Sequence, residues 1–203
     1  MVWTYMAVTF PKCIHLASIS KSTRLPSFLK NGRKGLTSSM SGYILGVGIQ
    51  REEWPIVLSE LYRVLKPGGS IQLVDHLSDT TTVGPTYKPA LELADEILSK
   101  RGLIHDCPLQ LPTILKQTGF IDIVAEKKHY PIGEAGGELG KLASDTVIDG
   151  FRNLMHAIKE ENIEFSKKEL ERMLTELKKE WDGPECALGT VWIIRAKKPV
   201  QTT

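Results

Sequence analysis

The stretch EEWPIVLSELYRVLKPGGSIQLVD, residues 52–75, decides the fold class of this 203-residue chain. Its first half carries apolar side chains at the three- and four-residue spacing of one helical face. These side chains are Trp54, Val57, Leu58, Leu61, Tyr62 and Leu65. Glu52 and Glu53 stand in the first turn, where the positive end of the helix dipole favours acids. The pattern predicts an amphipathic helix that packs on another layer of structure.

A turn and a strand follow this helix. Pro67 disfavours a helical conformation in the residue before it, and Gly68 and Gly69 supply the backbone freedom for a reversal. The apolar run that follows leads to Asp75, which we expect at the carboxyl end of a short buried strand. Because ligands bind at that edge of open α/β sheets, Asp75 and the adjacent His76 are candidate site residues.

Asp75 and His76 are predicted to be catalytic, since a carboxylate beside an imidazole can act as a general base. The simpler alternative is that Asp75 caps its strand and binds backbone amides of the polar loop expected at residues 76–86. His105 and Asp106 form a second such pair on a connector, where solvated loop residues are the simpler interpretation.

Composition is typical of a globular protein, with 41% hydrophobic and 25% charged residues. No apolar run approaches the length of a membrane span, so we expect neither a transmembrane helix nor a membrane partner. Three cysteines, Cys13, Cys107 and Cys186, are odd in number and far apart. They indicate reduced thiols rather than a disulfide framework or a metal site, and hence a cytoplasmic protein.

The first 50 residues have an unusual charge pattern, because they contain no Asp or Glu. Their basic residues are Lys12, Lys21, Arg24, Lys30, Arg33 and Lys34. Such a segment fits a mitochondrial transit peptide, a basic arm for an anionic partner, or a mispredicted start joined to a sound domain. We favour the third interpretation because the segment lacks amphipathic periodicity, and we expect no nucleic-acid partner. The predicted division is a basic, poorly ordered segment over residues 1–42 and a domain over residues 43–203.

Short elements are expected before residue 52. Residues 13–19 predict a strand, residues 37–42 a polar linker, and the apolar run 43–49 another strand. Gly46 and Gly48 invite comparison with a nucleotide-binding loop, which needs glycines after its strand and an acid about 20 residues later. Neither follows here, so we interpret the run as a strand that contains glycine.

Helices and strands alternate after residue 75. The expected elements are two helices closed by Gly102 and Gly119, a strand over 120–128, a helical insertion over 136–182, and a strand over 187–196. The first inserted helix has an apolar stripe of Leu139, Leu142, Ala143, Val147, Phe151, Leu154, Met155 and Ile158. A capping box from Ser166 to Glu169 begins the second. This order predicts an α/β fold with a helical insertion before its last strand.

The turn RVLKPGG, residues 63–69, and the strand that leads to Asp75 resemble a segment of class I S-adenosylmethionine-dependent methyltransferases. The resemblance is nearest to the fungal secondary-metabolism type, in which such a turn precedes the fifth strand of a seven-stranded Rossmann-like sheet. The lead-in IQREEW at 49–54 and the step LKQTGF at 115–120 are similar too. The resemblance covers residues 43–198, about three quarters of the chain.

This resemblance implies the cofactor S-adenosyl-L-methionine and methyl transfer to a small, secondary-metabolite-like molecule. It places Asp75 and His76 at the pocket and Tyr43 on the cofactor side, although Tyr43 also fits a half-buried strand tyrosine. In the family an insertion caps the substrate pocket, which Phe151 and Met155 would then line. The family's cofactor-binding half is missing or replaced here, because residues 1–50 contain no acid for the ribose hydroxyls.

Two functions follow from this resemblance. The first is a methyltransferase built on an incomplete Rossmann-like sheet. The alternative is a truncated, catalytically impaired domain that acts as a binding or interaction module. In either case we expect an open sheet edge through which two copies of the chain can associate.

Overall fold

The computed structural model describes residues 8–10, 13–17, 36–42, 49–81, 84–103, 106–184 and 187–200. Within these ranges, side chains are described from residue 49 onward, apart from residues 76–81 and 154–157. Tyr43, His105 and the glycine-containing run that begins at Tyr43 lie outside the described residues, so the predictions made for them stay predictions.

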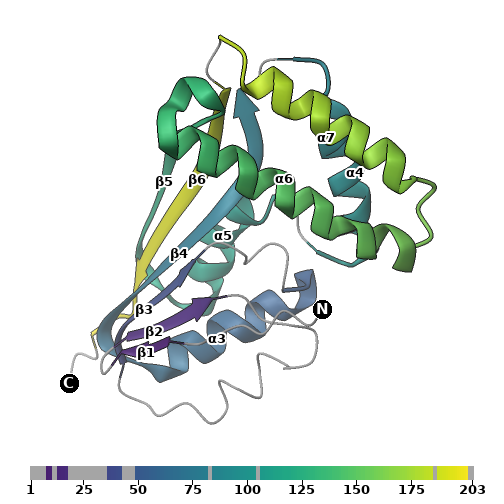
Figure 1. Cartoon of the computed structure of the whole chain (residues 1–203). Coiled ribbons are helices and arrows are strands. Elements are labelled where there is room, and N and C mark those ends of the chain that lie inside the picture. Colours follow the sequence, from purple (N-terminus) through teal and green to yellow (C-terminus); the bar gives the residue numbers. More distant parts are fainter. Residues whose placement is uncertain are drawn as a thin grey trace. The chain divides into compact units, whose positions relative to one another are not determined.

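The described strands form a six-stranded sheet in the order β1-β2-β3-β4-β6-β5 (Figure 1). They are Val8–Phe10 (β1), Cys13–Ala17 (β2), Leu36–Gly42 (β3), Leu65–Thr81 (β4), Ile121–Ile132 (β5) and Ala187–Lys197 (β6). Parallel pairing joins β2, β3 and β4, and β1 runs antiparallel to β2. The predicted fold class is confirmed: the chain is α/β, with an incomplete Rossmann-like sheet.

Helices connect the strands in the predicted order. They are α3 (Trp54–Val64), α4 (Tyr87–Lys100), α5 (Cys107–Thr118), α6 (Gly137–Glu160) and α7 (Lys167–Trp181), with the short 3-10 helices η1 (Arg51–Glu53) and η2 (Glu134–Gly136). The helices η2, α6 and α7 lie between β5 and β6 in the chain. They form the helical insertion that was expected before the last strand.

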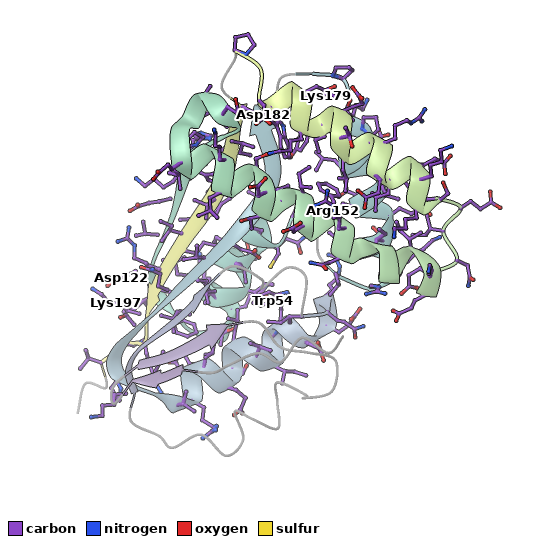
Figure 2. The ribbon with its side chains drawn as sticks, in the orientation of Figure 1. Trp54, Asp122, Arg152, Lys179, Asp182 and Lys197 are labelled. Atoms are coloured by element: carbon purple, nitrogen blue, oxygen red, sulfur yellow. The ribbon has the colours of Figure 1, made fainter. Side chains whose placement is uncertain are left out.

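Side-chain contacts show that β5 and β6 are antiparallel. Asp122 near the start of β5 pairs with Lys197 at the end of β6, with 3.3 Å between carboxylate and ammonium (Figure 2). Farther along β5, Glu126 pairs with Arg195, a residue earlier in β6. Since β6 is the last strand in sequence yet lies between β4 and β5, β5 is left at the edge of the described sheet.

Strand β4 is longer than predicted at both ends. Against β3 its register passes from Leu36 opposite Leu65 to Ser38 opposite Ser70, so β4 accommodates three additional residues there. These residues include Gly68, whose φ of +77° needs glycine, and they form the predicted turn. Beyond Asp75 the expected loop is wrong, because β4 continues to Thr81. The β-branched threonines at its end are good strand residues.

The prediction of a polar linker at residues 37–42 is also wrong, because this segment is β3. Its serines give no apolar alternation, but its backbone is paired with β2 on one side and β4 on the other. Pairing on both sides satisfies the backbone N–H and C=O groups whatever the side chains are. The strand predicted from Cys13 is confirmed as β2, and β1 was not predicted. The predicted boundary at residue 42 adjoins undescribed residues and stays a prediction.

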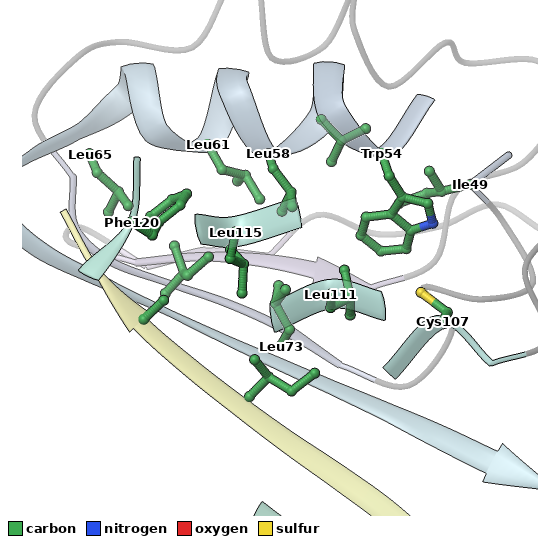
Figure 3. Close-up of a cluster of buried hydrophobic side chains, with 14 residues drawn as sticks. Ile49, Trp54, Leu58, Leu61, Leu65, Leu73, Cys107, Leu111, Leu115 and Phe120 are labelled. Atoms are coloured by element: carbon green, nitrogen blue, oxygen red, sulfur yellow. The ribbon is translucent and has the colours of Figure 1, made fainter. Parts of the chain in front are cut away.

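The chain divides into two compact units, and unit 1 comprises residues 1–77, 103–128 and 191–203. Its core lies between α3, α5 and the sheet (Figure 3). The predicted face of α3 is buried in that core, with Trp54, Leu58 and Leu61 almost inaccessible to solvent. Tyr62 is partly buried and meets Phe120 edge-on, with 5.1 Å between ring centroids.

Lys198, just after β6, holds the turn between α3 and β4. Its ammonium donates to the carbonyl oxygens of Tyr62, at 2.7 Å, and Leu65, at 2.9 Å. The same ammonium lies 4.6 Å from the centroid of the Tyr62 ring. Its backbone N–H and C=O also bond to Gly69 and Gly68. A cation therefore satisfies the last carbonyls of α3, where the helix dipole favours positive charge.

Unit 2 comprises residues 78–102 and 129–190 and is mainly helical. Its core is formed by α4, α6 and α7 and includes Phe151 and Trp181. The capping box at the start of α7 is confirmed, since the Ser166 N–H donates to the Glu169 carboxylate at 2.8 Å and the Glu169 N–H to Ser166 Oγ at 3.2 Å. Phe151 belongs to the core of this unit. The side chain of Met155 is not described.

The predicted stripe of α6 is wrong at its start, where Leu139 and Leu142 are 57% and 65% exposed. Ser144 and Ile148 are buried instead. The cause is Gly140, where a Cβ atom would stand 2.2 Å from the carbonyl oxygen of Gly133. This close backbone approach requires a glycine on the packed face and turns the two leucines away from it.

Alanine substitutions at two glycines separate backbone strain from steric conflict. Gly133 and Gly137 both have positive φ, at 93° and 64°, in a region that is almost specific to glycine. We expect Gly137→Ala to cost about 1–3 kcal/mol of unfolding free energy from backbone strain alone, since its Cβ would meet no atom within 4 Å. Gly133→Ala should cost about 1–3 kcal/mol more, since its Cβ would lie 1.9 Å from the Trp181 carbonyl oxygen. Equal losses in urea unfolding would contradict this account.

Two neighbouring lysines test the contact at the end of α3. Lys198→Met removes two hydrogen bonds from a partly buried cation, and we expect a loss of about 2–3 kcal/mol in unfolding free energy. Lys197→Met is the matched control, because Lys197 makes only an exposed ion pair with Asp122. It should change stability by less than about 1 kcal/mol. Similar midpoints for the two variants in chemical unfolding would refute a special role of Lys198.

Candidate functional site

Asp75 lies on the helix-covered face of the sheet in unit 1. Along β4, Ile71, Leu73 and Asp75 are buried in alternation with half-buried residues, as the two-residue period of a strand requires. Ile71 and Leu73 belong to the core beneath α3 and α5. Asp75 is only 5% exposed, so its carboxylate stands at the end of an apolar row.

The start of α5 brings a buried thiol and a second carboxylate into this region. Asp106 precedes the helix, and its carboxylate accepts a hydrogen bond from Gln110 at 2.6 Å. Cys107 follows and is buried. Burial raises the pKa of the Cys107 thiol well above its usual range, and the nearby carboxylates of Asp75 and Asp106 raise it further. The thiol is therefore protonated, in surroundings that are poorly hydrated and negative in potential.

Trp54, the first residue of α3, lies at the same end of the core. The Gln50 N–H donates to the Glu53 carboxylate at 3.0 Å and the Glu53 N–H to the Gln50 carbonyl at 2.9 Å, which fixes the start of the helix. Figure 3 shows the Trp54 indole beside Ile49 and above Cys107. Its side chain is fully buried, and its Nε1–H has no hydrogen-bond partner among the residues that the structure describes.

Trp192 belongs to β6 and to unit 1. Farther along β6, Ile194 is buried in the same core as Leu73. The Trp192 Nε1–H is buried and also lacks a partner. An unpaired buried donor is costly, so these two N–H groups need explanation.

The predicted site residues lie at different kinds of position in the structure. Asp75 is buried inside β4, so it neither ends a strand nor caps a loop that begins at residue 76. His76 follows it in β4, but its side chain is not described, and its role stays a prediction. Asp106 directly precedes α5, and because His105 lies outside the described residues, the interpretation of the two as a solvated pair stays a prediction.

Sequence reasoning missed Trp192, Trp54 and Cys107 as site residues. Trp54 and Trp192 were assigned to the apolar pattern of a helix and a strand, and Cys107 to isolated reduced thiols. An unpaired indole N–H has no sequence signature, because it depends on neighbours from other elements. Only the proximity of Cys107 to Asp106 in sequence gave a hint of the thiol's surroundings.

Metal and membrane sites were also sought among the described residues. Within them, no group of three or more His, Cys, Asp and Glu side chains is arranged to hold a metal ion. The helices described here include none with both the length and the apolar character needed to cross a membrane.

No protein-family model and no curated protein matches this chain. Solved structures that it resembles include a SAM-dependent methyltransferase from Archaeoglobus fulgidus, at 18% identity and a TM-score of 0.42, covering 87% of this chain and 66% of that one. The [4+2]-cyclase SpnF has 17% identity and a TM-score of 0.45, with 88% and 56% covered. Phosphoethanolamine N-methyltransferase 2 from Haemonchus contortus, in complex with S-adenosyl-L-methionine, has 16% identity and a TM-score of 0.37, with 81% and 33% covered.

The chain spans about a third of the length of the Haemonchus contortus enzyme. At these low identities and TM-scores, the similarities assign the chain neither a family nor an activity.

The buried thiol predicts a pH dependence of stability. Because the pKa of Cys107 is raised on folding, the folded chain keeps a proton that the unfolded chain releases above about pH 8.5. Its contribution to stability is therefore complete below that pH and declines as the pH rises. Urea unfolding at about pH 7.5 and about pH 10 should show a larger loss for the native chain than for Cys107→Ala. Identical losses in the two proteins would mean that the thiol ionises normally.

Proposed function

We propose that this chain binds S-adenosyl-L-methionine and transfers its methyl group to a small molecule, as a methyltransferase of class I. Two features support the proposal. The segment over residues 54–75 resembles the fifth-strand region of that family, and the structure folds it as helix, turn and strand. The helical insertion between β5 and β6 agrees with the resemblance as well.

The observation that carries the proposal is the buried carboxylate of Asp75 beside Cys107 and Asp106. The cofactor has positive charge on its sulfonium and its ammonium groups. Negative potential in a poorly hydrated region stabilises such a cation more strongly than it would in water. The pKa of Cys107 is raised mainly by burial and further by the carboxylates of Asp75 and Asp106, so the thiol lies close enough to both acids to be affected by their charge.

The residues present fit the charged part of the cofactor. Asp75 is the acid of this region that is buried on a strand, and it lies near the buried thiol of Cys107. The acid that the resemblance implies for the ribose hydroxyls has no counterpart in residues 1–50. We propose Tyr43 on the cofactor side, on the strength of the resemblance alone.

S-adenosylmethionine, when bound, would supply a methyl group on a positively charged sulfur; the acceptor atom would bond to the methyl carbon as the carbon–sulfur bond breaks, and the sulfur would leave as a neutral thioether. Asp75 stabilises positive charge near the transferred group, because its carboxylate is buried and fixed in a strand. We assign to His76 the removal of the acceptor's proton, since it is adjacent to Asp75 in β4. The apolar row of Ile71 and Leu73 beneath Asp75 limits access of competing water.

The methyl acceptor that we propose is a small, secondary-metabolite-like molecule, in line with the fungal type of the resemblance. A cytoplasmic location, and association of two copies through an open sheet edge, remain predictions. A chain that binds the cofactor without turnover would fit the alternative of a binding module.

Calorimetric titration with S-adenosylmethionine and S-adenosylhomocysteine tests the proposal. Both should bind the native chain, and Asp75→Asn should weaken S-adenosylmethionine binding by about 10- to 150-fold, the cost of one hydrogen bond to a charged group. Asp122→Asn is the matched control, because Asp122 is an exposed carboxylate of the same unit, and it should leave affinity unchanged. Absence of heat with both ligands, for a chain that unfolds cooperatively, would disprove the function.

A further inference from the structure

The carboxylate of Asp106 is oriented by a side chain of the helix that it precedes. An aspartate in this position ordinarily accepts from the free backbone N–H groups of the first helical turn. Asp106 accepts no such bond from α5, which is described throughout. Its carboxylate accepts instead from Gln110 Nε2 at 2.6 Å, one turn farther along the helix. The helix thus forgoes a side-chain cap, and Gln110 determines where the carboxylate lies.

Arg51 determines which way the Gln110 amide faces. Its Nη1 donates to Gln110 Oε1 at 3.3 Å, although the two residues are 59 positions apart in sequence. Because the amide oxygen faces the guanidinium, the amide NH₂ group is left to donate to Asp106. An isolated antiparallel bridge between Gln50 and Leu103 joins the same two segments through the backbone. Arg51, Gln110 and Asp106 therefore form a chain of hydrogen bonds from η1 to the start of α5.

The oriented carboxylate acts on the buried region at the start of α5. Burial raises the pKa of the Cys107 thiol, and the charges of Asp75 and Asp106 raise it further. Gln110 is neutral, so its hydrogen bond fixes the Asp106 carboxylate without cancelling its charge. The charge of Asp106 therefore reaches the region to which we assign the cofactor's cation.

We propose that Gln110, oriented by Arg51, is a positioning residue that directs the Asp106 carboxylate toward the positive sulfur of S-adenosylmethionine. This inference rests on the proposed function, since it concerns the same cofactor. When the methyl carbon bonds to the acceptor, the carbon–sulfur bond breaks and the sulfur keeps the electron pair. The by-product S-adenosylhomocysteine then has a neutral sulfur, and its attraction to Asp106 is lost. Gln110 thereby favours binding of the cofactor over binding of its by-product.

A purely structural role for Gln110 is the competing explanation, because polar pairs four residues apart stabilise helices slightly. Such a role would weaken the binding of both ligands alike. A role through Asp106 acts on the positive sulfur, and S-adenosylmethionine and S-adenosylhomocysteine differ only by the methyl group that makes the sulfur positive. The ratio of the two affinities therefore separates the two explanations.

Calorimetric titration would measure both ligands with the native chain and with Gln110→Met, which keeps a long unbranched side chain of good helix propensity. The preference for S-adenosylmethionine over S-adenosylhomocysteine should fall about 3- to 10-fold, the worth of one hydrogen bond. Gln117→Met is the matched control, because it makes the same change at an exposed position of α5 and should leave the ratio unchanged.

A double variant tests whether Gln110 acts through Asp106. Asp106→Asn removes the charge itself and should lower the preference at least as much as Gln110→Met does. Adding Gln110→Met to Asp106→Asn should then change the ratio no further, since residues that act as a unit are not additive.

Arg51→Met should lower the preference in the same direction but less, because Gln110 keeps its bond to Asp106 in one of two amide orientations. Arg63→Met is its control, since Arg63 pairs with Glu60 within α3. That variant should bind both ligands in the native ratio.

Nuclear magnetic resonance of the native chain gives a readout that does not depend on how well a variant folds. With ¹⁵N labelling, the side-chain amide resonances of Gln110 should move when S-adenosylmethionine is added and move less with S-adenosylhomocysteine. The Gln117 amide should respond to neither ligand.

Equal weakening of both ligands by Gln110→Met would give Gln110 a structural role only. A further loss in the double variant would show that it does not act through Asp106. Either result, or equal shifts of the Gln110 amide with the two ligands, overturns the inference while the proposed function stands. A native chain that binds neither ligand would disprove the proposed function and this inference together.

Discussion

Unit 1 depends on the hydrogen bonds that Lys198 makes with the turn between α3 and β4. Its ammonium binds the carbonyl oxygens of Tyr62 and Leu65, and its backbone bonds to Gly68 and Gly69. One residue thus binds the end of a helix and the turn that follows it, and joins the end of β6 to the start of β4.

Burial decides the chemistry of that site more than residue identity does. A solvated aspartate, tryptophan and cysteine would be unremarkable on a surface. In unit 1 the Asp75 carboxylate is buried at the end of an apolar row, the Cys107 thiol is protonated, and the indole N–H groups of Trp54 and Trp192 have no acceptor among the described residues. The carboxylates of Asp75 and Asp106 near that thiol link this region to the proposed cationic cofactor.

The errors of sequence interpretation share a physical cause. Residues 37–42 form β3 although they are polar, because backbone pairing on both sides stabilises a strand without apolar side chains. Leu139 and Leu142 of α6 are exposed because Gly140 packs against the backbone of Gly133. In the first case strands distant in sequence override the local pattern, and in the second a close backbone contact just before the helix does so. Asp75 could be identified from the sequence because a predicted strand leads to it. The residues that lie near it in space could not.

By itself the sequence determined the α/β class, the order of elements from α3 to β6, the turn at Gly68 and the capping box of α7. Hydrophobic period, helix caps and glycine turns act within a few residues, so they are legible in one chain. Only the tertiary structure decided the extent of β4, the place of β6 between β4 and β5, and the position of Cys107 in the core with Trp54 and near the carboxylate of Asp75. Strand pairing and unpaired buried donors depend on residues far apart in sequence, and no local pattern records them.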